Sequence, residues 1–227
     1  MQETFHIFRL GLQDALSRQN LRYFLYALLM VVAGLVVGYW LLYSPVTGWL
    51  KGVAGGEGWL FGGLAFLFHA LFGVLGYLLL PPMVLMVVSL FSERIVENIR
   101  QQHYPQLTRG EGIAAVPLIL LQLKSFGRYL LLLLLASPLL LLMGVGYLLY
   151  LAIGFFLFRR LLMLEVLGVR MPLEQMEVQI AAGGYRWTVL LLYLLTLVPV
   201  LNLLVPYLAL CIVSHESMRL ELREADV

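Results

Sequence analysis

The sequence predicts an all-α integral membrane protein, from its composition, the length of its apolar runs and the placement of its charges. The chain has 227 residues, of which 62% are hydrophobic and 12% charged. Its apolar runs are far longer than a soluble core helix needs. If these runs cross the membrane, 14 of the 15 Lys and Arg residues fall on one side of it and only Lys51 falls on the other. The positive-inside rule makes the basic side cytoplasmic.

Residues 1–18 are expected to form an amphipathic helix lying in the membrane interface. Apolar side chains recur there at helical spacing, and polar residues such as Glu3 and Asp14 occupy the other faces. The apolar positions are Phe5, Phe8, Leu12 and Leu16. The pattern places this helix on the membrane surface, ahead of the first span.

Two conventional membrane spans are predicted at residues 21–43 and 59–90. The glycine-rich loop Ser44–Gly58 between them carries few charges and is expected to face outward. Pro81–Pro82 deprives the second span of backbone donors, so a kink is expected there. Residues 91–103 then continue the helix as a charged cytoplasmic extension.

The apolar runs Tyr129–Phe158 and Trp187–Val213 are predicted to fold back as helical hairpins, covering residues 116–158 and 187–222. A single crossing by the first of them would leave a cluster of arginines outside, against the positive-inside rule. These are Arg159, Arg160, Arg170 and Arg186. A hairpin keeps them inside, so that both the N-terminus and the C-terminus face the cytoplasm.

Turn-forming residues lie near the middle of both runs. They are Ser137, Pro138, Gly144 and Gly146 in the first run, and Pro199, Asn202 and Pro206 in the second. Each arm would measure roughly 20 Å, short of the ~30 Å hydrocarbon layer, unless flanking residues such as Val116–Leu123 extend it. The hairpins are therefore expected to penetrate partway, and their turns need shelter from lipid in a cavity or in a homo-oligomer.

Several segments resemble the CysZ sulfate permeases and their etoposide-induced-protein relatives. The resemblance is carried by Leu197–Pro206 with its Pro-x-Leu-Asn motif, by Phe91–Arg100 and by Phe155–Gly168. The order of elements also matches: an interfacial helix, two long spans, a charged extension and two hairpins. The resemblance implies an oligomeric sulfate channel of the bacterial inner membrane that supplies cysteine synthesis.

The resemblance also implies a sulfate site at the start of the first span, where the family has a Gly-hydrophobic-Arg-Arg-like stretch. The matching residues are Asn20, Leu21, Arg22 and Tyr23, with Asn20 in place of the glycine and Tyr23 in place of the second arginine. Free N–H groups and the positive end of a helix dipole favour an oxyanion, Asn20 is a competent N-cap, and Arg22 adds a forked donor. The alternative for Arg22 is an anchor that reaches the lipid headgroups.

Other polar residues are candidates for a pore or an inner vestibule, each with a structural alternative. Pore candidates are Pro199, Asn202, Pro206 and His69; Asn202 is more simply a turn residue, and His69 a neutral hydrogen-bonded histidine. Vestibule candidates are Glu93, Arg94, Glu97 and Arg100. Their spacing also fits a solvated helix face on which opposite charges pair with each other.

Enzyme, metal and nucleic-acid functions find no support in the sequence. His215-Glu216 lacks the second histidine of a metalloprotease pair, the other three histidines are scattered along the chain, and no nucleotide-binding motif or cofactor signature is present. The formal charge of +2 is too small to indicate nucleic acid. Two functions remain: transport of sulfate or a related oxyanion through a multi-pass membrane protein, or a non-transporting scaffold in the lipid bilayer.

Overall fold

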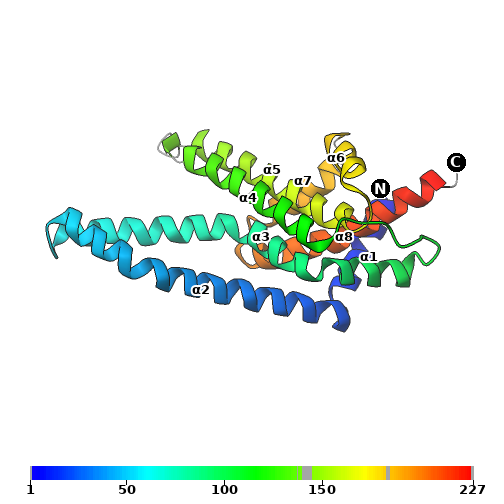
Figure 1. Ribbon diagram of the computed structural model, residues 1–227, viewed down its shortest axis with the longest axis horizontal. Coiled ribbons are helices and arrows are strands. Elements are labelled where there is room, and N and C mark those ends of the chain that lie inside the picture. Colours follow the sequence, from blue (N-terminus) through cyan, green and yellow to red (C-terminus); the bar gives the residue numbers. More distant parts are fainter. Residues whose placement is uncertain (1, 137, 140–144, 183–184, 226–227) are drawn as a thin grey trace.

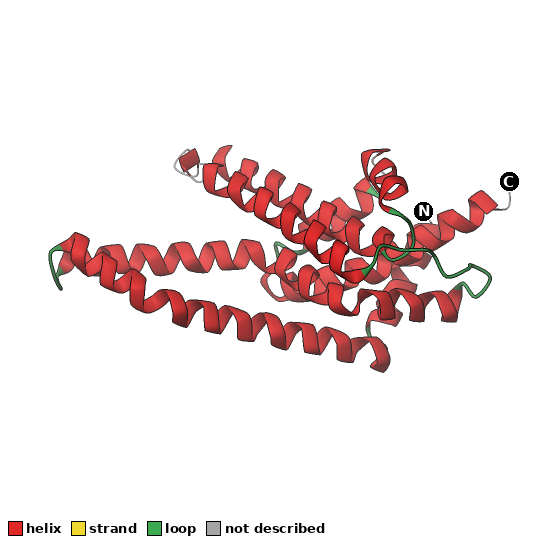
Figure 2. Ribbon diagram, in the orientation of Figure 1, coloured by secondary structure: helices red, strands yellow, loops and turns green. Residues whose placement is uncertain are grey.

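The computed structural model describes residues 2–136, 138–139, 145–182 and 185–225, which form eight α-helices and no strand (Figures 1 and 2). The helices are α1 Gln2–Ala15, α2 Arg18–Ala54, α3 Trp59–His103, α4 Ala115–Ala136, α5 Val145–Gly168, α6 Leu173–Ala182, α7 Arg186–Leu195 and α8 Pro199–Ala225. Within the described residues, five segments are long and apolar enough to cross a membrane, or six if α6 and α7 form one broken span. The prediction of an all-α membrane protein is confirmed.

Helix α1 is the predicted N-terminal helix, and it packs against α8. A Cβ at Gly11 would overlap Ile212 of α8, so the two helices are in close contact. The opposite face keeps Phe5, Leu12 and Leu16 exposed, as an interfacial helix requires. Helix α1 therefore has one face on α8 and one apolar face turned outward.

Helices α2 and α3 form a long antiparallel pair that extends to one side of the molecule (Figure 1). The expected outward loop Ser44–Gly58 is mostly helical, because α2 continues through Pro45 and ends only at Gly55, which has a φ of 71°. Helix α3 includes both the predicted span and its charged extension. It stays helical through Pro81–Pro82, and its ribbon changes direction between its cyan and green parts, in keeping with the predicted kink.

The first predicted hairpin is the antiparallel pair of α4 and α5. Its arms have 22 and 24 residues, which at 1.5 Å per residue is roughly 33 and 36 Å. They are longer than predicted because the flanking segments, including Val116–Leu123, join the helices. Of the predicted turn residues, Ser137 and Gly144 lie outside the described residues, Pro138 lies between the two helices and Gly146 lies inside α5.

The second predicted hairpin is asymmetric, with a 10-residue arm in α7 and a 27-residue arm in α8. Its turn is Thr196–Val198, so Asn202 and Pro206 lie inside α8 and not in the turn as predicted. Pro199 begins α8, where a proline costs no helical hydrogen bond. The sequence signal was a cluster of turn-forming residues, but none of them lies in the turn, and Pro199 directly follows it.

The buried core lies at the end of the molecule that holds both termini (Figure 1). It joins the middle of α8 to the C-terminal half of α5 and to the part of α3 that follows Pro82. Its largest fully buried side chains include Tyr207, Phe158, Leu85 and Ile95. This core fixes the positions of the charged residues on α3, which lie on the same stretch of helix.

Candidate functional site

The start of α2 lies three residues earlier than the sequence predicted. Ser17 is the N-cap, and its hydroxyl accepts a hydrogen bond from the Asn20 backbone N–H at 3.4 Å. The proposed N-cap, Asn20, is buried: its side-chain amide donates to the Asp14 carbonyl at 3.2 Å and its oxygen accepts from Asn98 at 3.0 Å. Asn20 is therefore a link between α1, α2 and α3, and its N–H is already paired.

Arg22 and Tyr23 lie beside Arg94 of α3. An Arg22 guanidinium nitrogen donates to the Tyr23 hydroxyl at 3.4 Å, and the Arg94 guanidinium lies close enough to interact electrostatically with that hydroxyl. The Tyr23 ring is buried against Phe91, with ring centroids 5.5 Å apart, whereas both arginine residues are exposed. The structure thus gathers two residues of the predicted sulfate stretch and one of the predicted vestibule.

The other three vestibule candidates make ion pairs. Glu97 accepts two hydrogen bonds from Arg100, at 2.9 and 2.7 Å, and a third from Gln101. Glu93 pairs with Arg109 at 2.5 Å. In contrast, Arg22 and Arg94 form no ion pair with a carboxylate within the described part of the chain. The predicted self-paired helix face is present for Glu97 and Arg100 but does not include Arg94.

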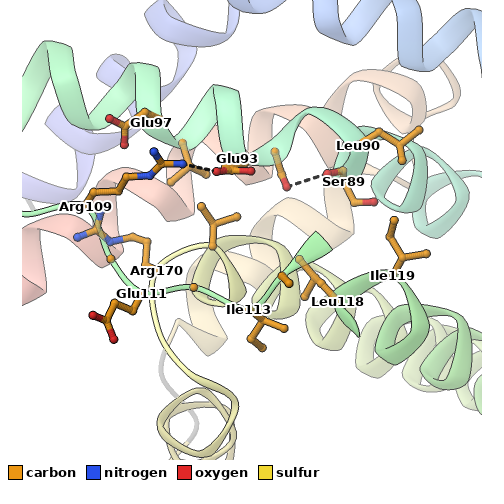
Figure 3. Close-up of a pocket in the computed structure, with 16 residues that line it drawn as sticks. Ser89, Leu90, Glu93, Glu97, Arg109, Glu111, Ile113, Leu118, Ile119 and Arg170 are labelled. Atoms are coloured by element: carbon orange, nitrogen blue, oxygen red, sulfur yellow. Dashed lines mark hydrogen bonds and ion pairs between the residues drawn. The ribbon is translucent and has the colours of Figure 1, made fainter. Parts of the chain in front are cut away.

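A pocket of about 410 Å³ lies where α3 meets the segment between α3 and α4 (Figure 3). Glu93, Glu97, Arg109 and Arg170 line it. These four are paired, since Arg170 donates to Glu221 at 2.7 and 3.2 Å, and Glu111 adds a further carboxylate to the lining. The pocket therefore carries charges of both signs and offers an anion little uncompensated attraction.

Two glycines hold the wall of this pocket against the end of α5. A Cβ at Gly110 would overlap the Arg170 carbonyl, and one at Gly112 would overlap the Val169 carbonyl. The Ile113 N–H donates to the Gly168 carbonyl at 2.7 Å, which closes the contact. Only glycine permits so close an approach of two backbones.

A second pocket, of about 510 Å³, lies among α4, α5 and α6 and is rich in cations. Glu177 is the carboxylate in its lining, and it pairs with Arg160. Arg159 donates to the Ile180 carbonyl at 2.9 Å, while its buried Nε has no hydrogen-bond partner. The remaining cations of the lining are Lys124 and Arg128.

The family described as "Sulfate transporter CysZ/Etoposide-induced protein 2.4" matches residues 7–221 of this chain. The chain belongs to this family. No curated protein and no solved structure matches it. The family resemblance seen in the sequence is thereby confirmed, and with it a multi-pass membrane protein of transporter-like type.

Asn202 has a structural role in this CysZ-family chain. Pro81 has no N–H to donate to the Tyr77 carbonyl one helical turn earlier. The Asn202 amide supplies that donor at 3.1 Å, and the Tyr77 hydroxyl in turn donates to the Leu197 carbonyl at 2.7 Å. These two bonds fix the turn of the second hairpin to α3 at its prolines. The amide oxygen of Asn202 is buried without a hydrogen-bond partner.

His69 lies on an exposed part of α3, among aromatic rings. Its Nδ1 is 2.5 Å from the Ala65 carbonyl of its own helix. The rings of Tyr39, Tyr43 and Phe68 lie within 6.3 Å of the imidazole, centroid to centroid. This arrangement fits the structural alternative of a histidine that is hydrogen-bonded to a neighbouring group.

Glu165 of α5 is a buried acidic residue that the sequence analysis did not single out. It is fully buried, accepts a hydrogen bond from the Gln122 amide, and retains one carboxylate oxygen without a partner. It follows directly on the apolar stretch Leu161–Leu164. A glutamate there was a detectable signal, because an acidic residue within a membrane-spanning helix is a functional candidate by default.

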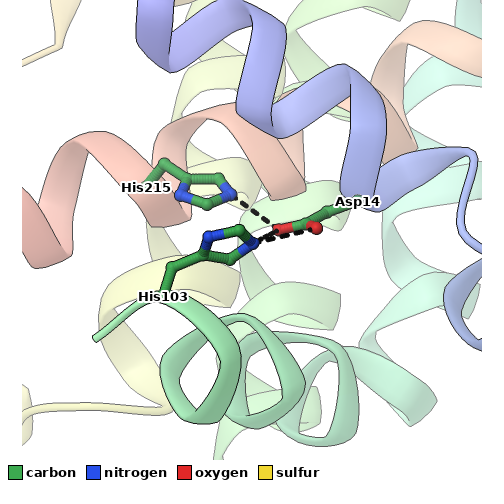
Figure 4. A group of neighbouring side chains, drawn as sticks. All are labelled: Asp14, His103 and His215. Atoms are coloured by element: carbon green, nitrogen blue, oxygen red, sulfur yellow. Dashed lines mark hydrogen bonds and ion pairs between the residues drawn. The ribbon is translucent and has the colours of Figure 1, made fainter. Parts of the chain in front are cut away.

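Asp14, His103 and His215 form a second group that sequence reasoning missed (Figure 4). Burial raises the pKa of Asp14, but hydrogen bonds from His215 and His103 outweigh it and leave the pKa below its usual value. These residues come from α1, α3 and α8. The sequence places His103 and His215 far apart, which is why they were taken as scattered.

Proposed function

We propose that this chain carries sulfate, or a chemically similar oxyanion, across the bacterial inner membrane and so supplies cysteine synthesis. Its membership of the CysZ family supports transport of this kind. The observation on which the proposal depends is the arrangement of Arg22 and Arg94 around the Tyr23 hydroxyl.

Two guanidinium groups beside one hydroxyl repel each other when no carboxylate stands between them. A dianion bound there replaces this repulsion with attraction and can accept forked hydrogen bonds from both groups. Tyr23 occupies the place of the second arginine in the family's motif, and Arg94 brings a second cation from α3. The capture site is then Arg22, Tyr23 and Arg94, and Asn20 holds the helices that carry them.

Uptake of radiolabelled sulfate into proteoliposomes tests the proposal, at two internal pH values and beside empty vesicles. Arg22→Ala and Arg94→Ala should each weaken the apparent affinity for sulfate by roughly tenfold or more, since each removes a charge-assisted hydrogen bond. Arg9→Ala, which removes an exposed cation of α1, is the matched control and should behave as the wild type.

The possible outcomes distinguish an error in the position of the capture site from an error in the proposed function. Uptake that survives both substitutions but is lost in Arg128→Ala would move the capture site to the second pocket. No uptake above empty vesicles by folded wild-type protein would reject sulfate transport and favour the scaffold.

We further propose that both termini face the cytoplasm and that the protein is a homo-oligomer. The basic residues support this orientation through the positive-inside rule, with Lys51 at the far end of α2. The turns of the hairpins need a neighbouring subunit or cavity as shelter from lipid. A membrane-impermeant thiol reagent tests the orientation: it should label Glu57→Cys from outside intact cells and leave Glu111→Cys unlabelled.

A further inference from the structure

We infer that Asp14, His103 and His215 form a binding site for one divalent transition-metal ion, such as Zn²⁺ (Figure 4). One nitrogen or oxygen ligand atom from each residue lies within 4.8 Å of the other two. Both histidines turn Nε2 toward the carboxylate. The inference does not depend on the proposed transport function.

The distances are close to those of a metal site. His215 Nε2 lies 2.8 Å from Asp14 Oδ2, and His103 Nε2 lies 3.1 Å from the same oxygen. Ligands bound at ~2.0–2.1 Å around a tetrahedral zinc ion lie about 3.3 Å from each other. Small rotations of the side chains, about half an ångström at the ligand atoms, would therefore replace the shared protons with a metal ion.

The donor set selects the kind of ion. Two imidazole nitrogens and one carboxylate are typical ligands of Zn²⁺ and neighbouring transition metals. Mg²⁺ and Ca²⁺ instead require mostly oxygen ligands, and this group offers one carboxylate. A transition-metal ion is thus the expected occupant, and Mg²⁺ is the natural negative control.

Tyr104 provides the outer hydrogen bond that metal-binding histidines usually make. Its hydroxyl lies 3.0 Å from His215 Nδ1 and 3.4 Å from the His215 carbonyl. When Nε2 binds a metal, the ring is the other tautomer: Nδ1 carries the proton and donates a hydrogen bond to the Tyr104 oxygen, and the hydroxyl proton turns to the carbonyl. Without a metal, the hydroxyl donates to Nδ1 and Nε2–H donates to Asp14. Both states leave every polar atom of His215 paired.

The group of Asp14, His103 and His215 is buried on all sides except the one next to His103. The side chain of His215 is fully buried and that of Asp14 is 8% exposed, whereas that of His103 is 29% exposed. Water can complete the coordination from the His103 side. Because the three ligands come from α1, α3 and α8, a bound ion would join the N-terminal helix to two of the helices that form the core.

Metal binding can be measured directly on detergent-solubilised protein after its affinity tag is removed and a chelator is dialysed away. Titration calorimetry with Zn²⁺ should give one site per chain in the wild type, and Co²⁺ should give visible absorption bands of a nitrogen- and oxygen-ligated ion. His103→Asn should lose these bands and bind Zn²⁺ at least about tenfold more weakly. His6→Asn, which changes an exposed histidine of α1, should bind as the wild type.

A milder variant guards against misfolding. Tyr104→Phe keeps all three ligands and removes the outer hydroxyl, so its affinity should fall by about tenfold while its Co²⁺ bands remain. Zn²⁺ should raise the melting temperature of the wild type, and Mg²⁺ should not. The inference is overturned if the wild type binds no stoichiometric Zn²⁺, or if His103→Asn and Tyr104→Phe both bind it with unchanged affinity; the group is then a hydrogen-bonded network alone.

Discussion

The two ends of the α2–α3 pair have similar apolar sequences but very different surroundings. At the far end, from Val32 of α2 to Val74 of α3, most described side chains are exposed, and Trp40, Trp49 and Trp59 are each at least 67% exposed. At the near end, Val84, Leu85 and Ile95 are completely buried by other helices of the same chain.

This difference shows what hydrophobicity alone specifies in a membrane protein. Apolar side chains at the far end need only lipid or another subunit, so the sequence there is free to be repetitive. At the near end, close contacts, ion pairs and buried polar groups fix how the helices meet. Substitutions of one type should therefore have opposite consequences at the two ends.

The largest effect is expected when alanine replaces a glycine on each side of this division: Gly112, in the segment that follows the near end of α3, and Gly63, in the far end of α3. Gly112→Ala places a methyl group on the Val169 carbonyl and forces two backbones apart, so we expect a loss of more than about 3 kcal/mol in stability. Gly63→Ala in the far end of α3 meets no atom within 4 Å. It should stabilise the helix by up to about 1 kcal/mol, because alanine is the better helix former.

Melting temperatures in one detergent, followed by size-exclusion chromatography with fluorescence detection, measure both variants. Equal melting temperatures for the two would contradict the division of the pair into a packed end and an unpacked end. A large loss from Gly63→Ala alone would place an unrecognised contact, such as a subunit interface, at the far end.

A smaller effect is expected at Asn202, which lies near the boundary between the two ends. Asn202→Ala leaves the Tyr77 carbonyl without the donor that Pro81 denies it, which should cost about 1–3 kcal/mol. Pro81→Ala restores an N–H at the right place in the helix. The double variant should therefore be more stable than Asn202→Ala alone. If Pro81→Ala gives no recovery, the amide of Asn202 does not act as a substitute for the missing backbone donor.

The sequence was sufficient to predict the features that depend on the local pattern of apolar and charged residues, namely the helices and their approximate bounds. Run length and turn-forming residues were sufficient for the long helices α2 and α3, including the charged extension of α3, and for the helix pairs α4–α5 and α7–α8. The N-cap was misplaced because Asn20 and Ser17 are both good capping residues, and the contact of Asn20 with Asp14 and Asn98 decides between them. Local pattern does not tell which capping residue will be buried.

The side-chain groups were missed because their members are distant in sequence. His215 meets Asp14 across 201 residues, and Asn202 meets the Tyr77 carbonyl across 125. Arg94 was expected to pair with Glu97, since their spacing on the helix permits an ion pair. It lies instead on the face of α3 that is next to Tyr23 of α2. Such choices are made by packing between helices, which a single sequence does not specify.

The smallest effect is expected for the ion pair at the far end, where Lys51 and Glu57 lie 2.5 Å apart on the exposed turn between α2 and α3. The hydrogen bond from Lys51 lowers the pKa of Glu57 from its usual 4.5. Because the folded-state pKa is the lower one, any stabilisation is present above pH 4.5 and is lost as the pH falls through the folded value. Water and salt screen so exposed a pair.

Glu57→Gln should therefore lower the melting temperature only slightly at pH 7 in low salt, and the difference should vanish in high salt or below the folded pKa of Glu57. A large difference that persists in high salt would mean that this turn is buried in the assembled protein, and the far end would then be as tightly specified as the near one.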